Sequence, residues 1–511
     1  MTETYGTVLA DAIARAGDRP ALRARGEART HRELLASASR FAHALAASGL
    51  VPGDRVCLMV EDRVESLEAY VGVLIGGFVP VHINDRLLAP EVAAIVERAG
   101  ARAFVHTDGR TPVVDQVSGM TGDGGLVVIC IGEDALPGSA RFADLVAVGS
   151  TVPPRVSRLP GDLAFIGFTS GTTGLPKGVA HTQQTMLRIL RHMPVHWGLS
   201  PRSRCATTGT LSFVSGIWGI MLPHLYLGGE ISFMGGSKPD EWVDRMVREG
   251  TQVTSVPSPL AAGFVEAVRA RTELLTTLRT VIHSGSSMPA EARRQIVDLV
   301  GPGFVEAYGM TETGAPVTRT VPEDWSERCL AEDVYASAGR PVHIAEVAVL
   351  GPDGSPLSTG QTGELAVRSD TLFDGYYEQP EQTAEAMSAG WFRTGDLGRV
   401  DGAGYVYITD RLKDMVVSGG MNVFPAEVER VLVTMPGVAA AAVFGVPHER
   451  WGETVVAAVV RSDDAVTADG VIDWVRGRMA SYKKPTQVRF VPQLPLNASK
   501  KIDKIALRAN W

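Results

Sequence analysis

Alternating strand and helix signals run along the first third of the chain and restrict the folds it can adopt. Thr30 and Glu33 have the spacing of a helix capping box, and an apolar stripe at helical spacing continues from them to Leu45. The elements expected next are strands at 55–60, 78–83, 102–106 and 126–131, and helices at 66–73 and 89–98. This alternation predicts a mostly parallel sheet covered by helices on both faces, with ligands bound at the carboxyl ends of its strands.

Length, composition and net charge limit the number of domains and the classes of protein to which the chain can belong. At 511 residues the chain is too long for one ordinary core, so two or more domains are expected. A hydrophobic content of 45% with 21% charged residues is typical of a globular protein. The net charge of −8 and the lack of a basic run argue against a nucleic-acid surface.

Cysteines and apolar runs indicate a cytoplasmic location. The chain has four cysteines and no Cys-x-x-Cys pair, which predicts reduced, buried thiols. Its first residues lack a basic region followed by an apolar core, so no signal peptide is expected. The longest apolar run, 71–81, is too short to span a bilayer and contains several glycines and a proline. We interpret it as a buried helix end that leads into a strand.

A glycine-rich stretch at 169–179 follows an apolar run, 163–168, that is expected to be a strand. In such a turn, backbone N–H groups and hydroxyls close around phosphate oxygens, and a lysine adds a positive charge. Because Pro176 precedes Lys177 and Gly178 follows it, the stretch is not a Walker A loop, which ends in Gly-Lys-Ser/Thr. The structural alternative is a flexible surface loop rich in glycine, serine and threonine.

Two further loops, 284–289 and 308–312, each follow an expected strand. Alone, either could be a plain turn between a strand and a helix; together they suggest a nucleotide cleft at one sheet edge. From 342 to 400 short strands and tight turns indicate a small β-subdomain. Beyond 410–414 a tail of about a hundred residues is large enough for a small α+β domain.

These segments, in this order, resemble the AMP-forming acyl-CoA synthetases of the adenylate-forming enzymes. The resemblance covers about 80–504 and also includes 363–368, 390–396, 410–429, 482–485 and 494–502. It implies a large N-terminal α/β domain, 1–410, with parallel-rich sheets covered by helices and a small β-subdomain. A small mobile α+β domain, 411–511, is expected to follow.

The resemblance also assigns nucleotide contacts. Tyr308 would stack on adenine, Asp396 would accept the ribose hydroxyls, and Glu312 would bind Mg²⁺. A glutamate at a helix N-terminus is the structural alternative for Glu312, and a salt bridge at the domain boundary is the alternative for Arg411. The full expected ATP/AMP set is Thr169, Ser170, Gly171, Thr172, Thr173, Gly174, Lys177, Ser284, Gly285, Ser286, Glu306, Ala307, Tyr308, Gly309, Met310, Thr311, Asp396, Arg411 and Lys501.

Lys501 is the expected catalytic lysine, with Thr169 and Glu312 as further catalytic residues. In the resembling enzymes this lysine contacts the carboxylate and the α-phosphate, and a cation there offsets the repulsion between two anions. The family ends in Ser-Gly-Lys, whereas this chain reads Ser499-Lys500-Lys501. A solvated basic tail is the structural alternative.

The substrate region departs from the family pattern. Many relatives have an aromatic residue and a histidine where this chain has Ser212 and Phe213. The expected acyl pocket, for which ordinary core packing is the alternative, comprises Phe213, Val214, Gly216, Trp218, Gly309 and Pro316. The expected coenzyme A channel comprises Ser418, Gly419 and Gly420, and the expected hinge is Lys413.

The resemblance implies a two-step reaction with ATP, Mg²⁺ and coenzyme A. A small carboxylic acid, by hypothesis an aryl or medium-chain acid, is adenylated and then transferred to coenzyme A by a monomer or homodimer. One alternative is transfer to a carrier protein or another nucleophile. Another is a non-catalytic nucleotide-binding regulator, against which the intact Lys177, Glu312, Asp396 and Lys501 argue.

Overall fold

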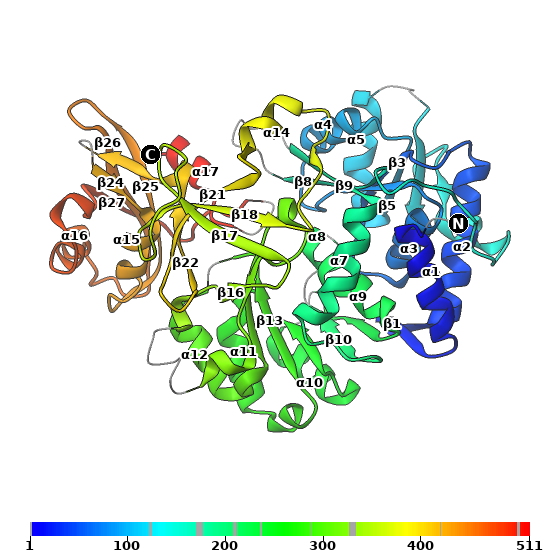
Figure 1. Ribbon diagram of the computed structural model, residues 1–511, viewed down its shortest axis with the longest axis horizontal. Coiled ribbons are helices and arrows are strands. Elements are labelled where there is room, and N and C mark those ends of the chain that lie inside the picture. Colours follow the sequence, from blue (N-terminus) through cyan, green and yellow to red (C-terminus); the bar gives the residue numbers. More distant parts are fainter. Residues whose placement is uncertain are drawn as a thin grey trace. The chain divides into compact units, whose positions relative to one another are not determined.

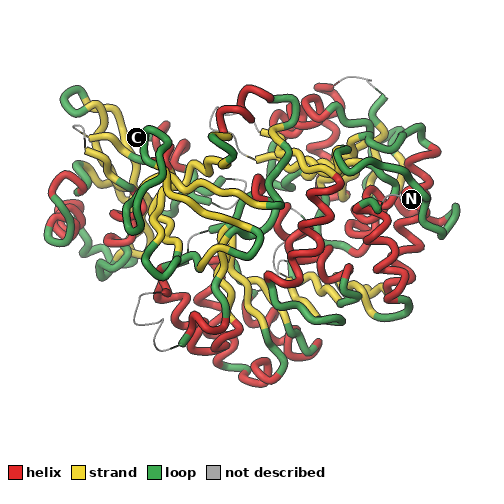
Figure 2. Tube along the Cα trace, in the orientation of Figure 1, coloured by secondary structure: helices red, strands yellow, loops and turns green. Residues whose placement is uncertain are grey.

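The computed structural model is a mixed α/β protein (Figures 1 and 2). It describes residues 3–121, 125–169, 177–207, 211, 213–235, 238–286, 288–326, 334–418, 421–497 and 501–511. The chain forms two compact units. Unit 1 comprises residues 1–346 and 368–387, and unit 2 comprises residues 347–367 and 388–511.

A nine-stranded sheet forms one layer of unit 1. Its centre, from β14 to β1, is parallel, and the strands at both edges pair antiparallel. Its strands in spatial order are β16 (Arg340–Pro341), β15 (Thr318–Arg319), β14 (Phe304–Tyr308), β13 (Thr280–Ser284), β12 (Val253–Ser255), β10 (Arg204–Thr207), β11 (Glu230–Phe233), β1 (Pro20–Ala24) and β2 (Glu27–Thr30).

An eight-stranded sheet forms the second layer of unit 1. It is parallel from β8 to β7, while β9 pairs antiparallel with both β8 and β19. Its strands in spatial order are β19 (Gly375–Tyr376), β9 (Lys177–Thr182), β8 (Leu163–Thr169), β4 (Val79–His82), β3 (Arg55–Met59), β5 (Ala103–Thr107), β6 (Val127–Ile131) and β7 (Ala140–Arg141).

Helices fill the space between these two sheets and cover their outer faces. One core joins both sheets through α1 (Tyr5–Ala16), α2 (His31–Ala47), α3 (Val64–Ile75), α7 (Gln183–His196) and α9 (Leu222–Tyr226). A second core packs α10 (Pro239–Glu249), α11 (Ala261–Arg269) and α12 (Ala290–Val300) on the nine-stranded sheet. A third packs α4 (Ala89–Ala99) and α5 (Thr111–Thr121) on the eight-stranded sheet. The predicted cover of helices on both faces is therefore confirmed.

Local expectations mostly agree with this unit. The capping box at the start of α2 is present, because Thr30 N–H donates to Glu33 Oε2 at 2.8 Å and Glu33 N–H donates to Thr30 Oγ1 at 3.2 Å. The apolar run at 71–81 is buried, with α3 ending at Ile75 and β4 beginning at Val79. Strand β9, from Lys177 to Thr182, was not expected from the sequence.

Unit 2 contains two small sheets. In the first, β17 (Ala345–Leu350), β18 (Gly363–Ser369), β21 (Trp391–Val400) and β20 (Met387–Ser388) follow one another, and β22 (Val406–Arg411) pairs with β21. The second contains β24 (Met421–Val423), β23 (Val416–Ser418), β26 (Gly452–Arg461), β25 (Val438–His448) and β27 (Gln487–Phe490). Helices α15 (Pro425–Leu432) and α16 (Ala468–Arg476) share one core with this second sheet, and α17 (Lys504–Ala509) shares another. The expected domain boundary at 410/411 lies inside unit 2 and stays a prediction.

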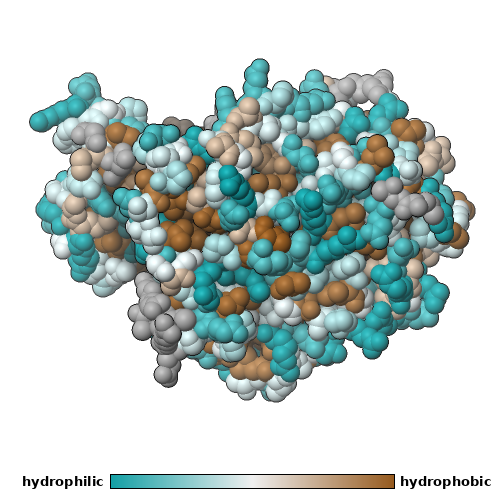
Figure 3. Space-filling view, in the orientation of Figure 1, coloured by the Kyte–Doolittle hydropathy of each residue, from teal (hydrophilic) through white to brown (hydrophobic). Residues whose placement is uncertain are grey.

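Buried thiols and a mixed surface agree with the composition. Cys57, Cys130 and Cys205 are buried free thiols, and burial raises the pKa of Cys57 and of Cys205. Hydrophilic and hydrophobic residues are interspersed on the face in view (Figure 3). In the part of the chain that the structure describes, no helix has the length and apolar character needed to cross a membrane.

Candidate active site

The predicted loops after β13 and β14 open on the same sheet edge. The two strands are parallel neighbours, and Ser284 pairs in register with Ala307. Gly285 follows β13 with a φ of +83°, a conformation that favours glycine. Tyr308 is the last residue of β14 and is largely buried. The prediction that both loops open on one sheet edge is therefore confirmed, and this is the edge at which ligands bind in parallel sheets.

The turn after Tyr308 holds Glu312 in a compact loop. Its short helix η6 (Thr311–Thr313) begins where Met310 N–H donates to Thr313 Oγ1 at 3.0 Å. A Cβ on Gly309 would lie 3.0 Å from the carbonyl oxygen of Ala315, so this close approach favours glycine. Glu312 itself is half-buried, which leaves its carboxylate partly accessible.

Tyr376 links the two predicted charged groups of this site. Its hydroxyl donates to Glu312 Oε1 at 3.2 Å, and Lys177 Nζ lies 4.9 Å from the centroid of its ring. Burial, together with the nearby charge of Glu312, raises the pKa of Tyr376, so the phenol stays protonated and acts as donor. Strand pairing explains its position, because Tyr376 of β19 pairs with Val179 of β9. Lys177 and Glu312 therefore share one neighbour in unit 1.

Both ends of the predicted phosphate loop are held in a strand ladder. Thr169 at the end of β8 pairs with Lys177 at the start of β9. The expected strand at 163–168 is confirmed as β8. The predicted phosphate contacts Ser170, Gly171, Thr172, Thr173 and Gly174 lie outside the described residues.

Glu312 fits the magnesium role that the sequence predicts. Mg²⁺ is usually held by one or two carboxylates together with substrate phosphates and water, so a single accessible carboxylate beside the phosphate loop suffices. Within the described ranges no group of three or more His, Cys, Asp or Glu residues could hold a metal ion. The arrangement thus suits an ion that binds with the nucleotide.

Trp218 forms an aromatic cluster next to the Glu312 loop. It lies on the π-helix η2 (Ile217–Met221), after α8 (Val214–Gly216), and π-turns are frequent at functional sites. Its ring centroid lies 4.6 Å from that of Phe165 and 5.1 Å from that of His181. His181 Nε2 lies 2.9 Å from the carbonyl oxygen of Thr311. The predicted pocket wall is therefore tied to the loop that carries Glu312.

Burial lowers the pKa of His181 to about 4, which keeps the ring neutral at pH 7. A neutral ring donates its Nε2 proton to the Thr311 carbonyl oxygen. Of the other predicted pocket residues, Trp218, Gly216 and Pro316 are buried, and Phe213 and Val214 are half-buried. Sequence analysis missed His181 and Tyr376; the signal for His181 was a polar residue inside the apolar run Val179-Ala180-His181.

The predicted ribose contacts lie together in unit 2. Asp396 of β21 pairs in register with Arg411 of β22, and Arg411 Nε lies 2.9 Å from Asp396 Oδ1. The carboxylate is buried while the guanidinium is half-exposed. The salt bridge considered as the alternative for Arg411 is therefore present, and it leaves the arginine accessible to a ligand.

Lys501, in unit 2, is hydrogen-bonded through its backbone to Asn497. Its N–H donates to Asn497 Oδ1 at 3.0 Å, and its carbonyl oxygen accepts from Asn497 N–H at 2.8 Å. The residue itself is exposed. Ser418 ends β23 and Lys413 belongs to η9 (Leu412–Asp414). The predicted residues Gly419 and Gly420, and the neighbours Ser499 and Lys500, lie outside the described part of the chain.

Comparison with known families agrees with this geometry. Residues 9–377 match the model of the AMP-binding enzymes, and residues 427–501 match the model of the AMP-binding enzyme C-terminal domain. The chain belongs to the AMP-binding enzyme family. The first match alone spans more than two thirds of the chain and includes Lys177, Tyr308, Glu312 and Tyr376.

Relatives within the AMP-binding enzyme family are ligases. A feruloyl-CoA synthase from an Amycolatopsis species is 34% identical over 96% of this chain and 96% of its own length. The long-chain-fatty-acid–CoA ligase FadD13 of Mycobacterium tuberculosis is 34% identical over 94% of this chain and 93% of its own length. The ATP-bound crystal structure of MatB from Rhodopseudomonas palustris has a TM-score of 0.88 at 29% identity, with 98% of each chain covered.

Membership in the AMP-binding enzyme family confirms the expected class of enzyme, its cosubstrates and the fold. The chain is an AMP-forming acid–CoA ligase that uses ATP, Mg²⁺ and coenzyme A. The predicted fold, with a large α/β part rich in parallel strands and a small α+β part, is confirmed as well. The roles assigned to individual residues, and the acid, remain proposals.

Proposed function

We propose that this ligase activates an apolar carboxylic acid of aryl or medium-chain size and transfers it to coenzyme A. The observation that carries the site assignment is the placement of Lys177 and Glu312 on either side of Tyr376. A cation and a magnesium-binding carboxylate side by side match the two needs of a nucleotide triphosphate.

In the first step, a carboxylate oxygen of the acid attacks the α-phosphorus of ATP. The bond from the α-phosphorus to the bridging oxygen breaks, which yields acyl-AMP and pyrophosphate. Lys177 offsets the charge that moves onto pyrophosphate, and Lys501 offsets the repulsion between the two anions as they approach. Glu312 would hold Mg²⁺, which would supply further charge neutralisation at the phosphates.

Other residues of the proposed site bind and orient the nucleotide. Tyr308 stacks on adenine, and the backbone of Gly285 and Ser286 forms the opposite wall. Asp396 accepts the ribose hydroxyls, and Arg411, whose Nε lies 2.9 Å from Asp396 Oδ1, orients the carboxylate.

In the second step, the thiol of coenzyme A attacks the acyl carbonyl carbon and AMP leaves. We propose that the C-terminal part turns about Lys413 between the steps, so that Lys501 leaves and Ser418, Gly419 and Gly420 reach the thiol channel. A cytoplasmic location, where ATP and coenzyme A are available, and a monomeric or homodimeric state belong to the same proposal.

The aromatic cluster around Trp218 supports an apolar acid. Phe165, His181 and Trp218 present rings and one neutral imidazole, and none of the three carries a charge that would attract a second carboxylate. We therefore expect pyrophosphate release with cinnamic-type and medium-chain acids and little with dicarboxylic acids. A panel of acids at fixed ATP tests this, and uniform inactivity with aryl and medium-chain acids would remove the substrate proposal.

The acceptor is tested separately from the acid. Product masses are compared with coenzyme A present, with coenzyme A omitted, and with a pantetheine-loaded carrier protein in its place. We expect the acyl-CoA thioester in the first case and acyl-AMP in the second. A thioester formed on the carrier but not on coenzyme A would replace the proposed acceptor. If wild-type protein exchanged no labelled pyrophosphate into ATP with any acid, the adenylation proposal itself would fail.

A further inference from the structure

A hollow of about 380 Å³ lies at the β16 edge of the nine-stranded sheet, on residues that the proposed adenylation site does not use. All of its lining residues belong to unit 1. They come from β15, β16 and the segments that follow these strands: Arg319, Val321, Arg340, Pro341, Val342 and His343. The volume is in the lower part of the range for small-molecule sites, so a small organic ligand would fit.

Strand register puts the two arginines of this hollow on one face of the sheet. Arg319 pairs with Arg340 across the antiparallel strands β15 and β16, so both side chains leave the sheet on the same face. On its other side, Arg319 pairs with Ala307 of β14, one residue before Tyr308. Because side chains alternate along a strand, the side chain of Tyr308 leaves on the opposite face. The two arginines therefore lie across the sheet from the proposed adenine contact.

The charge of Arg340 is balanced within the fold. Arg340 Nη2 lies 2.6 Å from Asp324 Oδ1, and Asp324 Oδ2 accepts from Val321 N–H at 2.8 Å. The side chain of Asp324 is 0% exposed, so its carboxylate is not open to a ligand in the hollow. Of two like charges that face each other across the strands, one thus has a buried counter-ion.

Arg319 differs from Arg340 in this respect. Its Nη1 donates to the carbonyl oxygen of His196, the last residue of α7, at 2.9 Å, which is a favourable place for a cation. Within the described ranges, no carboxylate forms an ion pair with its half-buried guanidinium. Burial lowers the pKa of Arg319, although the charges of Asp324 and Glu323 act in the opposite direction. A guanidinium still stays protonated at neutral pH, so the hollow contains a positive charge.

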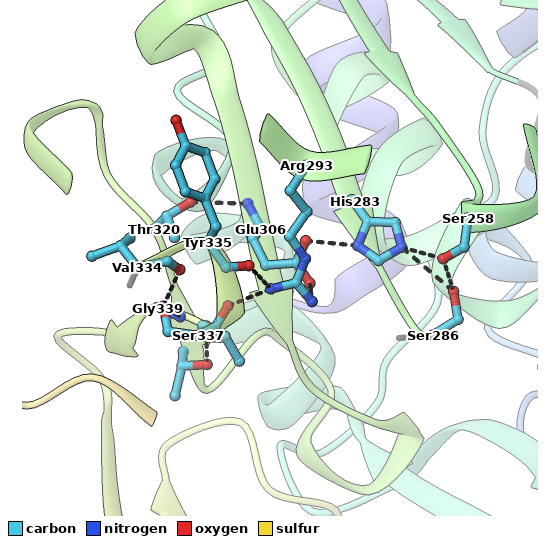
Figure 4. Close-up of polar contacts among 12 residues, drawn as sticks. Ser258, His283, Ser286, Arg293, Glu306, Thr320, Val334, Tyr335, Ser337 and Gly339 are labelled. Atoms are coloured by element: carbon cyan, nitrogen blue, oxygen red, sulfur yellow. Dashed lines mark hydrogen bonds and ion pairs between the residues drawn. The ribbon is translucent and has the colours of Figure 1, made fainter. Parts of the chain in front are cut away.

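A buried arginine elsewhere in unit 1 shows how the fold completes such a group (Figure 4). Arg293 Nη1 donates to the carbonyl oxygens of Tyr335 at 2.9 Å and Ser337 at 2.6 Å, and Arg293 Nη2 lies 3.2 Å from the carboxylate of Glu306. Arg319 has a carbonyl partner of the same kind but, among the described residues, no carboxylate partner. A carboxylate supplied by a ligand would complete Arg319 in the same way.

The imidazoles beside the hollow also favour an anion. The ring centroid of His343, a lining residue, lies 5.3 Å from that of His192 and 5.7 Å from that of His196. Burial, together with the nearby charge of Arg319, lowers the pKa of His196 to about 3, so this ring is neutral at pH 7. Neither of its ring nitrogens hydrogen-bonds to a described residue. These rings add no negative charge that would repel an anion.

We propose that the hollow is an accessory binding site for a small monocarboxylic acid. The carboxylate pairs with the planar guanidinium of Arg319, and the apolar part of the acid packs on Val321 and Pro341. A phosphate ester carries nearly two negative charges. Because Asp324 already balances Arg340, a single negative charge matches this hollow better.

The test follows the reaction of Arg319 with phenylglyoxal, an arginine-selective reagent, in the wild-type protein without ATP. Peptide mass spectrometry measures the labelling rate of Arg319 beside that of Arg476, a reference residue of unit 2 that is 53% exposed. We expect benzoate to slow labelling of Arg319 in a saturable way and to leave Arg476 unchanged. Neutral benzamide should slow neither. Acetate, which lacks the ring, should need an about tenfold higher concentration for the same protection.

A variant of the hollow separates binding at this place from binding elsewhere. Val321→Phe adds bulk to the lining and leaves the contact between Arg319 and His196 in place, so benzoate should no longer slow labelling of Arg319. Urea denaturation checks that the variant is folded. The comparison of benzoate with benzamide in the wild type tests the proposal without any variant.

Several results would overturn the proposal. These are no labelling of Arg319, no protection by benzoate, equal effects of benzoate and benzamide, or equal slowing at Arg476. Protection that persists in folded Val321→Phe, or inorganic phosphate that protects at a lower concentration than benzoate, would do the same. No ATP is present and no adenylate forms, so the result is independent of the proposed function, which pyrophosphate release tests separately.

Discussion

Two carboxylate–arginine pairs differ in how much of each pair is buried: one joins a strand and a helix of unit 1, and the other joins two neighbouring strands of unit 2. In unit 1, the side chains of Glu306 and Arg293 are 4% and 8% exposed, and both carboxylate oxygens have partners. In unit 2, Asp396 is equally buried, but Arg411 is 47% exposed. Both carboxylate oxygens of the first pair are used and both side chains are buried, so this pair acts through the groups that it holds in place. The second can share its charge with a bound ribose.

Removing one partner of the buried pair in unit 1 should have the largest effect on the stability of the protein. Arg293→Met leaves Glu306 buried with one carboxylate oxygen unpaired, so we expect the free energy of unfolding to fall by about 3–5 kcal/mol. Urea denaturation measures this. Arg293→Met combined with Glu306→Gln should recover part of the loss, because no unpaired charge remains. A loss below about 1 kcal/mol in the single variant would mean that the two pairs do not differ.

Lys501 is an exposed residue of unit 2, so its role in catalysis can be separated from a role in folding. If it acts on reacting anions rather than on the fold, Lys501→Ala should slow adenylation by about 100- to 1,000-fold, the typical cost of losing one group that stabilises developing charge. Formation of the thioester from supplied acyl-AMP should change far less. Single-turnover measurements of both steps check this; equal losses in both would indicate a folding role. Lys504→Ala is a matched control, because Lys504 Nζ pairs with Glu429 at 2.9 Å.

The imidazole of His181 is a second buried polar group of unit 1. Its contribution to stability can be measured through the pH dependence of unfolding. Burial lowers its pKa from 6.5 to about 4, so between these values the unfolded chain binds a proton that the folded ring does not. The resulting stability is complete above pH 6.5 and is lost as pH falls toward 4, by about 2 kcal/mol at pH 5. The drop in unfolding free energy from pH 7.5 to 5 should be smaller by that amount in His181→Leu. Identical drops in both proteins would contradict the prediction.

The smallest effect on stability is expected at the exposed pair. Arg411→Met should change the free energy of unfolding by less than about 1 kcal/mol, as is usual for ion pairs near the surface. KM for ATP should rise by about threefold to tenfold, because the carboxylate proposed to accept the ribose hydroxyls loses its orienting partner. Denaturation and steady-state kinetics on one preparation give both numbers. A large stability loss without a change in KM would mean that the pair in unit 2 supports the fold and does not bind the nucleotide.

Sequence patterns predicted the parts of this molecule that depend on short-range rules. The capping box at Thr30 and Glu33 and the buried run at 71–81 follow from spacing and hydrophobicity alone. Strand β9 was missed because Lys177 to Thr182 is short and polar at its ends; its stability comes from pairing with β8 and β19. The pairing with β19 joins segments about two hundred residues apart, which no local pattern records.

The residues of the candidate site also fall into those that local motifs predict and those that depend on long-range contacts. Motifs identified Lys177, Tyr308 and Glu312 as candidates because glycines and polar residues after apolar strands mark sheet edges, and the three lie at strand ends or in the turn that follows. Tyr376 was missed because its neighbour Glu312 is distant in sequence. Glu306 was predicted only as a nucleotide contact, although its carboxylate faces His283 and Arg293. Which way a buried carboxylate turns depends on an arginine from a separate helix, and spacing cannot show that.

Residues 368–387 belong to unit 1 although they follow part of unit 2 in the chain, and this affects the design of truncated fragments. Those residues return from unit 2 to complete unit 1, where they supply strand β19 and with it Tyr376. A fragment ending at residue 346 would keep almost every motif of the nucleotide site, yet its eight-stranded sheet would lack the outermost strand beside β9. Its exposed edge would be open to pairing with other copies. Truncations intended to isolate the nucleotide-binding half should therefore end after residue 387.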